Sequence, residues 1–271
     1  MSDHGLFGPK SVTWRVNRES VLLLGGGRAL LLQVAHPSVA AGVAQHSRYR
    51  EDPWGRLTRT LDVTRRIVFG DTEEAEDAAA RLREVHAHVH GTVEAGSRAG
   101  ERYEASDPDL LLWVWATLVE SALLVYTRYV GPLKIADVEA YYDEQKRFLA
   151  ACGAPAERAP ETFAQFMHWF DETVEHVLEV TPAAQDVADA ILRPRRLPLP
   201  LRPLYDALNL ATVGLLPPTL REQYGLGWGT QRERLLAAQT SAIRRLMPLA
   251  PALVRELPSA RSAERRLREA A

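Results

Sequence analysis

The sequence predicts an all-α protein built as a single multi-helix globular domain of about ten helices. Apolar residues recur at helical spacing along most of the 271 residues, and the alternating pattern typical of strands is scarce. Helix start and stop signals stand at several of the expected ends. We expect helices over residues 12–24, 27–44, 55–69, 73–90, 107–129, 135–152, 160–179, 183–193, 201–214 and 230–247, a short helix near the C-terminus, and at most a short hairpin near residues 92–104.

Capping residues support these boundaries in chain order. Gly70 and Asp71 separate the third expected helix from the fourth, whose first turns are rich in carboxylates, as the positive end of a helix dipole favours. Ser106-Asp107-Pro108 provides a cap, with proline near the first turn, for the apolar helix that follows. Gly153 closes the next helix, and Ala159-Pro160-Glu161-Thr162 opens the one after it.

A proline-rich segment divides the chain. Residues 193–203 contain four prolines and cannot be helical throughout, so we expect an extended connection between a main body, about 10–192, and C-terminal helices over 204–271. A connection inside one domain and a true boundary are equally compatible with the pattern. The arginine-rich tail (Arg255, Arg261, Arg265, Arg266 and Arg268) predicts a solvated helix face.

Composition excludes several classes of protein. A formal net charge of −2 gives no reason to expect nucleic acid as a partner. The single cysteine, Cys152, rules out an internal disulfide and fits a reducing compartment. No basic segment followed by an apolar run opens the sequence, and the apolar stretch 21–35 is too short for a membrane span. We therefore expect a cytoplasmic protein of undetermined oligomeric state.

Two familiar motif classes are weakly supported or absent. Gly25-Gly26-Gly27-Arg28 resembles a phosphate-binding loop superficially, but it lacks the Lys-Ser/Thr pair, so a kink or close helix packing is the simpler interpretation. A di-metal carboxylate site needs Glu-x-x-His on two helices, and no histidine here has an acidic residue three positions before it.

Three alternate histidines, His86, His88 and His90, are the most informative feature of the chain. On a strand they would point one way and could hold zinc. The apolar spacing before them instead predicts a helix from 73 to 90, ended by Gly91, on which His86 and His90 share a face and His88 does not. A three-histidine zinc site is therefore not expected, whereas a metal or haem ligand and an ordinary core or surface histidine remain open.

A second polar group lies earlier in the chain. Arg56, Arg59 and Thr60 share one face of the helix expected over 55–69, beside an apolar stripe. This arrangement suits recognition of a buried anion or a hydrogen bond to a polarised oxygen, but also an ordinary surface face. His36-Pro37 should end or kink its helix, which would let His36 line a pocket at that break.

Taken together, several segments resemble one known family. They are Leu30-Leu31-Leu32-Gln33-Val34-Ala35-His36-Pro37, Arg56-x-x-Arg59-Thr60, Val85-His86-Ala87-x-Val89, Asp107-Pro108-x-Leu110-x-x-Trp113-Val114 and Tyr129-Val130-Gly131-Pro132-Leu133. In this order, over about residues 10–250, they resemble the DUF2236 family, which includes the MpaB-type oxygenases and the latex-clearing rubber oxygenases. The resemblance implies an all-α fold that holds b-type haem.

The resemblance also implies roles for single residues. His86 matches the proximal haem ligand, and Arg56 and Thr60 match polar residues near the haem, with His36 and His90 expected around the cofactor. Arg59 stands where the rubber oxygenases have a lysine; a guanidinium stays protonated and cannot bind iron. Trp115 stands where many bacterial relatives have a histidine.

We therefore expect a haem b-dependent oxygenase-like protein. His86 would hold the iron, the apolar helices around 21–44 and 107–129 would enclose the porphyrin, and Arg56, Arg59 and Thr60 would act at the reacting centre on dioxygen and a small hydrophobic substrate of unknown identity. The alternative is a non-catalytic protein that binds haem or another hydrophobic ligand. A third possibility is peripheral membrane contact through the apolar segment 197–218.

Overall fold

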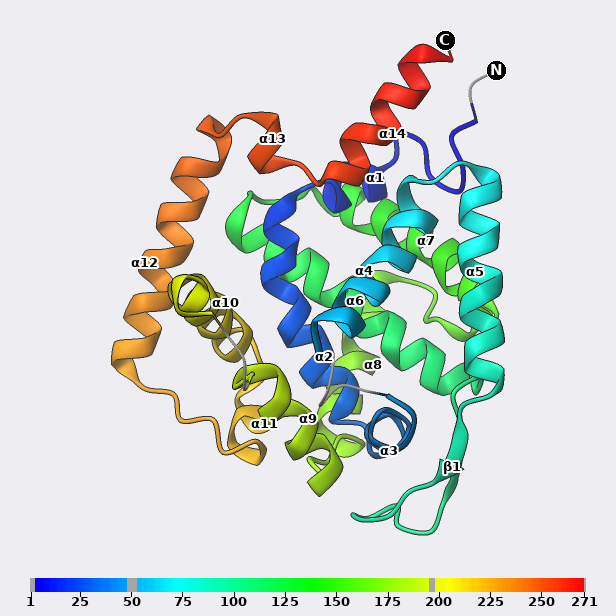
Figure 1. Ribbon diagram of the computed structural model, residues 1–271, viewed down its shortest axis with the longest axis vertical. Coiled ribbons are helices and arrows are strands. Elements are labelled where there is room, and N and C mark those ends of the chain that lie inside the picture. The colour runs from blue at the N-terminus through cyan, green and yellow to red at the C-terminus, as the bar shows by residue number, and fades with distance from the viewer. Residues whose placement is uncertain (1–2, 48–52, 195–197, 271) are drawn as a thin grey trace.

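The computed structural model confirms an all-α fold with one two-stranded hairpin (Figure 1). It describes residues 3–47, 53–194 and 198–270, and over 53–60 the backbone alone. The α-helices of this part of the chain are α1 (Val12–Asn17), α2 (Gly26–Val34), α3 (Pro37–His46), α4 (Pro53–Phe69), α5 (Thr72–Ala87), α6 (Pro108–Tyr129), α7 (Ile135–Cys152), α8 (Phe163–His176), α9 (Pro182–Leu192), α10 (Arg202–Gly214), α11 (Pro218–Gln223), α12 (Thr230–Leu246), α13 (Ala252–Arg255) and α14 (Pro258–Glu269). Short 3-10 turns are η1 (Ser20–Gly25), η2 (Ala156–Arg158), η3 (Leu199–Leu201) and η4 (Met247–Leu249), and the strands are β1 (His90–Thr92) and β2 (Arg102–Glu104).

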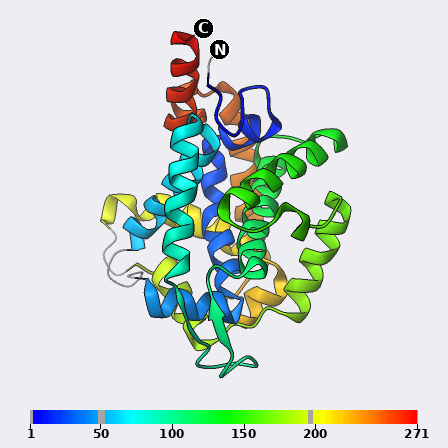
Figure 2. The ribbon, with the colours of Figure 1, turned by 90° about the vertical axis from the view of Figure 1, so that its right-hand side faces the viewer.

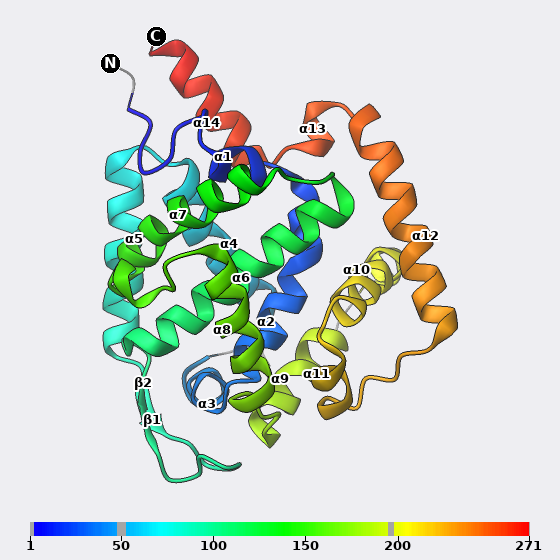
Figure 3. The same ribbon diagram turned by 180° about the vertical axis from the view of Figure 1, so that it is seen from behind.

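Helix α6 runs through the centre of the molecule (Figures 1 and 3). It packs against α2, α7 and α12, and most of its side chains are buried. Two indoles fasten it to its neighbours: Trp113 donates to the carbonyl of Leu32 at 3.2 Å and Trp115 to that of Gln145 at 2.9 Å. By length and composition α6 could cross a membrane, but 67% of its most apolar window is buried inside the fold, as in a core helix.

A buried ion pair joins α2 to α6. Arg28, 3% exposed, donates through Nη2 to Glu120 Oε1 at 3.0 Å and through Nη1 to Glu120 Oε2 and Ser121 Oγ. Its Nε donates to the carbonyl of Leu215, just after α10, at 2.6 Å. One guanidinium therefore satisfies acceptors from two neighbouring elements.

The glycines before Arg28 permit this close approach. A Cβ on Gly25 would lie 2.9 Å from Val125 Cγ2 on α6, and one on Gly27 would lie 2.3 Å from Thr212 Oγ1 on α10. Only a residue without a side chain fits at such distances. The close-packing interpretation of this glycine run is confirmed.

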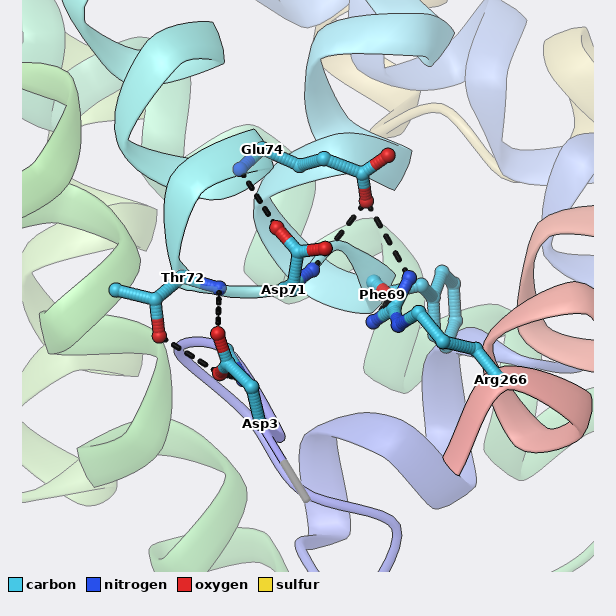
Figure 4. Close-up of polar contacts among 7 residues, drawn as sticks. Asp3, Phe69, Asp71, Thr72, Glu74 and Arg266 are labelled. Atoms are coloured by element: carbon cyan, nitrogen blue, oxygen red, sulfur yellow. Dashed lines mark hydrogen bonds and ion pairs between the residues drawn. The ribbon is translucent and has the colours of Figure 1, made fainter. Parts of the chain in front are cut away.

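The ends of the described chain meet at one turn, between α4 and α5 (Figures 2 and 4). Asp3 accepts hydrogen bonds from the backbone and the hydroxyl of Thr72, while Arg266 of α14 donates to Glu74 and to the carbonyl of Phe69. The expectation that the arginine tail is only a solvated face is therefore wrong for Arg266, because its guanidinium satisfies carbonyl and carboxylate oxygens left at this turn.

Several helix boundaries differ from those expected. The helix expected over 12–24 is two pieces, α1 and η1, with Arg18 and Glu19 between them. The break at His36-Pro37 is confirmed, since α2 ends at Val34 and His36 caps α3. The fourth helix ends at Ala87, because the following residues pair in the β1–β2 hairpin, where His90 lies opposite Glu104.

The close packing of Gly27 can be tested against its neighbour. Gly27→Ala should lower the free energy of unfolding by about 1–3 kcal/mol, because its methyl group would collide with Thr212. Gly26→Ala is the matched control: no atom lies within 4 Å of its Cβ position, so this change should be neutral or stabilise by up to about 1 kcal/mol. Denaturant unfolding measures both. A smaller loss from Gly27→Ala in a Thr212→Ala background would identify the contact, and equal effects of the two glycine changes would contradict it.

Candidate functional site

The α4–α5 helix hairpin carries most of the predicted site residues. Gly70 and Asp71 form its turn, and a capping box starts α5: Asp71 accepts from the backbone of Glu74, and Glu74 accepts from the backbone of Asp71. The two helices meet at this turn and diverge away from it (Figures 1 and 2). Residues 56–60 and His86 both belong to the ends of these helices that lie away from the turn.

The side chains of Arg56, Arg59 and Thr60 lie outside the described part of the chain. Their backbone is helical, within α4, as expected from the sequence. The interpretation of their shared face as an anion or oxygen site stays a prediction.

His86 is half-buried in the last turn of α5. Its Nδ1 atom is fully buried and has no hydrogen-bond partner among the residues that the structure describes. Burial lowers the pKa of the imidazole, which favours the neutral ring. Nine other buried side-chain nitrogens and oxygens in the described residues are also unpaired, so the unpaired Nδ1 of His86 is compatible with a ligand site but does not by itself define one.

His88 and His90 are placed differently from His86. His88 caps α5, with its Nδ1 2.8 Å from the carbonyl oxygen of Glu84. His90 is exposed on β1, and its carbonyl oxygen lies 3.0 Å from Nε2 of His46. The prediction that His86 and His90 share a helical face is therefore wrong, and a role for His90 beside the cofactor stays a prediction without that support.

His36 is buried at the start of α3, beneath the tip of the β1–β2 hairpin. Its Nδ1 lies 3.3 Å from the backbone nitrogen of Ser38, and its Nε2 lies 3.2 Å from Nη1 of Arg98. Burial, together with the Arg98 guanidinium, lowers the pKa of His36 to about 4. Both ring nitrogens face donors of the protein itself, and a role beside a cofactor stays a prediction.

The contact between His36 and Arg98 had no signal in the sequence. The two residues are 62 positions apart, and Arg98 reaches the ring because the hairpin folds back against the α2–α3 junction. Glu179 also holds the hairpin to this junction: its side chain accepts from the backbone and the hydroxyl of Ser97, and its own backbone N–H donates to the carbonyl of Ala35.

A cluster able to hold a bare metal ion is absent from the described residues, where no three His, Cys, Asp or Glu side chains come together. Cys152 is buried, and burial raises the pKa of its thiol to about 12, so it is unsuited to nucleophilic chemistry. A surface hollow of about 390 Å³ lies at the α11–α12 connection, lined by Pro218, Arg221, Glu222, Gly225, Leu226, Gly227 and Trp228. It shares no residue with the predicted site.

Comparison with known proteins places this fold among oxygenases. The model of the family described as "ER-bound oxygenase mpaB/B'/Rubber oxygenase, catalytic domain" matches residues 14–250. The chain belongs to this family. The resemblance inferred from the sequence motifs is thereby confirmed.

Two similar proteins come from mycobacteria, and both are described as uncharacterized. The proteins, from Mycobacterium bovis and Mycobacterium tuberculosis, are each 25% identical to this chain over 223 residues, which is 81% of this chain and 87% of theirs. No solved structure matches the chain significantly.

The burial of His36 predicts a pH-dependent stability. The pKa of His36 is lower in the folded protein than its ordinary value of 6.5, so the unfolded chain binds the proton first. The free energy of unfolding should therefore fall as the pH falls from about 6.5 to 4, by up to about 3 kcal/mol from this group.

His36→Asn provides the matched variant. Asparagine can still accept from the backbone of Ser38 as a helix cap, but it does not titrate. Denaturant unfolding at several pH values should show a weaker pH dependence for this variant. The same pH dependence in both proteins would show that His36 does not cause it.

Proposed function

We propose that this protein is a haem b-dependent oxygenase that uses dioxygen on a small hydrophobic substrate. The family supports the oxygenase activity, and His86 supports the cofactor: its ring is half-buried and neutral, and its buried Nδ1 has no partner among the described residues. A neutral imidazole is the form that binds iron.

The donor set fits haem better than a bare metal ion. A bare catalytic zinc needs about three protein ligands, and the described residues do not supply such a cluster. The porphyrin brings four nitrogen ligands of its own, so a single histidine from the protein is sufficient. His86 would hold this group, which when bound supplies the iron centre that activates dioxygen.

The polar residues of α4 would act beside that centre. We propose that Arg56 and Arg59 pair with the carboxylates of the cofactor or hydrogen-bond to polar groups at the reacting centre, and that the Thr60 hydroxyl orients them. Because the guanidinium of Arg59 does not lose its proton, it would stabilise negative charge rather than bind iron.

The packing between α2 and α6 does not favour the expectation that the helices around 21–44 and 107–129 enclose the porphyrin between them. The facing surfaces of these two helices are filled by the Arg28–Glu120 pair and by the contact of Trp113 with Leu32. We therefore place the cofactor against the α4–α5 hairpin rather than between α2 and α6.

A second candidate function is haem or hydrophobic-ligand binding without turnover. Trp115 favours it: this residue is 2% exposed, and its indole N–H is committed to the carbonyl of Gln145, so the position offers no titratable group. Arg59 in place of a lysine also favours binding without turnover, because a guanidinium stays protonated.

Reconstitution with haem tests the proposed ligand. The wild-type protein should show a Soret band with about one haem bound per chain. His86→Ala should lose most of that band, and added imidazole should restore part of it. His88→Gln is the matched control, because His88 lies in the same helix end but is exposed and bonded to Glu84.

An unchanged spectrum for His86→Ala would contradict the assignment. Metal analysis of the same samples for iron and zinc distinguishes haem from a bare metal ion. Oxygen uptake with candidate lipids and isoprenoids then separates the two functions: uptake that disappears in His86→Ala indicates an oxygenase, and a haem-loaded protein without uptake indicates a binding protein.

A further inference from the structure

An exposed apolar corner lies where α12 passes through η4 into α13, at the outer edge of the molecule (Figure 1). We call residues 246–254 the apolar corner. Its four large exposed side chains are Leu246, Leu249, Leu253 and Val254, which are 64%, 82%, 70% and 56% exposed. A cluster of exposed apolar side chains on a protein surface marks an interaction site.

The backbone of the apolar corner is held to the body of the protein at its far end. Ser20 donates its hydroxyl to the carbonyl of Val254 at 2.7 Å, and the backbone of Leu257 donates to the carbonyl of Arg18 at 2.7 Å. On the α12 side, Leu236 is fully buried and Gln239 donates to the carbonyl of Ala207. The exposed leucines therefore stand on anchored backbone rather than on a loose tail.

The exposed charges beside the apolar corner on its α12 side are positive, whereas Glu19 and Glu256 at its far end are each 7% exposed and lie beside Arg18. Arg244 and Arg245 are exposed in the last turn of α12, and residues 234–255 include four arginines and no acidic residue. The next carboxylate, Glu256, is 7% exposed and lies between Arg255 at 3.2 Å and Arg18 at 3.8 Å. The corner is thus an apolar surface with a cationic border, which complements a negatively charged surface.

The chemistry of the apolar corner favours a lipid surface over a protein. Residues 246–254 have no side chain that forms an ordinary hydrogen bond. A protein interface of this exposure combines its apolar centre with direct hydrogen bonds, whereas the acyl region of a bilayer requires none. Arginines close to inserted apolar side chains are typical of proteins that lie on anionic membranes.

We propose that the apolar corner inserts into the interfacial region of an anionic phospholipid bilayer, with Arg244 and Arg245 at the level of the headgroups. This contact is peripheral and does not depend on haem or on turnover. It differs in position from the segment 197–218 expected from the sequence, in which Leu199, Leu201 and Leu204 are exposed but the chain is mostly buried from Ala211 to Leu216.

Vesicle flotation of the full chain tests this proposal. The wild-type protein should float with vesicles of phosphatidylcholine that contain about 30% phosphatidylglycerol, and less with phosphatidylcholine alone. Leu249→Glu/Leu253→Glu should weaken binding about tenfold or more, because it places two carboxylates in the apolar layer. Arg244→Gln/Arg245→Gln should weaken binding to the anionic vesicles about fivefold per arginine and reduce its dependence on salt.

The matched control is Leu199→Glu/Leu204→Glu, which changes two similarly exposed leucines, one in η3 and one in the first turn of α10, 72% and 61% exposed. This variant should bind vesicles like the wild type, and all variants should keep the wild-type circular dichroism and melting temperature. The proposal is overturned if the wild type stays soluble with both vesicles, or if only the control pair weakens flotation. It is also overturned if Leu249→Glu/Leu253→Glu abolishes self-association in sedimentation velocity without any vesicle binding, which would identify a second copy as the occupant.

Discussion

The buried pair of Arg28 and Glu120 is the constraint around which the core is arranged. A charge taken out of water is tolerated only when its partners are complete, and Arg28 has acceptors from Glu120, Ser121 and Leu215. These acceptors come from α6 and from the residue after α10, so the guanidinium fixes α2 against both. Loss of either charged partner would leave the other buried without compensation. The glycines before Arg28 support this arrangement, because they let the backbone approach α6 and α10 closely enough for the guanidinium to reach its acceptors.

This arrangement also explains why a glycine-rich stretch here is not a nucleotide loop. In a phosphate-binding loop the glycines open space for a ligand, whereas at Gly25 and Gly27 the space is filled by Val125 and Thr212. Arg28, which follows the glycines, donates its hydrogen bonds to Glu120 and Leu215 inside the protein and is not free to bind a phosphate. The core is therefore closed at this point, with no space for a ligand beside Gly25 or Gly27.

Local sequence signals predicted most of the helices because the caps are local. Asp71, Asp107 and Thr162 each accept a backbone N–H within three residues, so their role is visible without the fold. The end of α5 was not predictable in this way. Val85 and Val89 continue the apolar spacing past the true end, and only pairing with residues 102–104 turns the chain into a strand. Contacts between distant segments, such as His36 with Arg98, leave no local signal at all. For the candidate site, the residues around His86 single it out in the sequence. They do not show that its Nδ1 atom is buried without a hydrogen-bond partner among the described residues.

The contacts at the turn between α4 and α5 affect the order in which parts of the protein unfold. Asp3 and Arg266 hold this turn from opposite ends of the described chain (Figure 4). Fraying around Asp3 or Arg266 would leave the N–H of Thr72 or the carbonyl of Phe69 without its partner, and so would loosen this turn before it reached the core around α6. Local unfolding around Asp3 or Arg266 should therefore open the α4–α5 turn while most of the helical content is still intact.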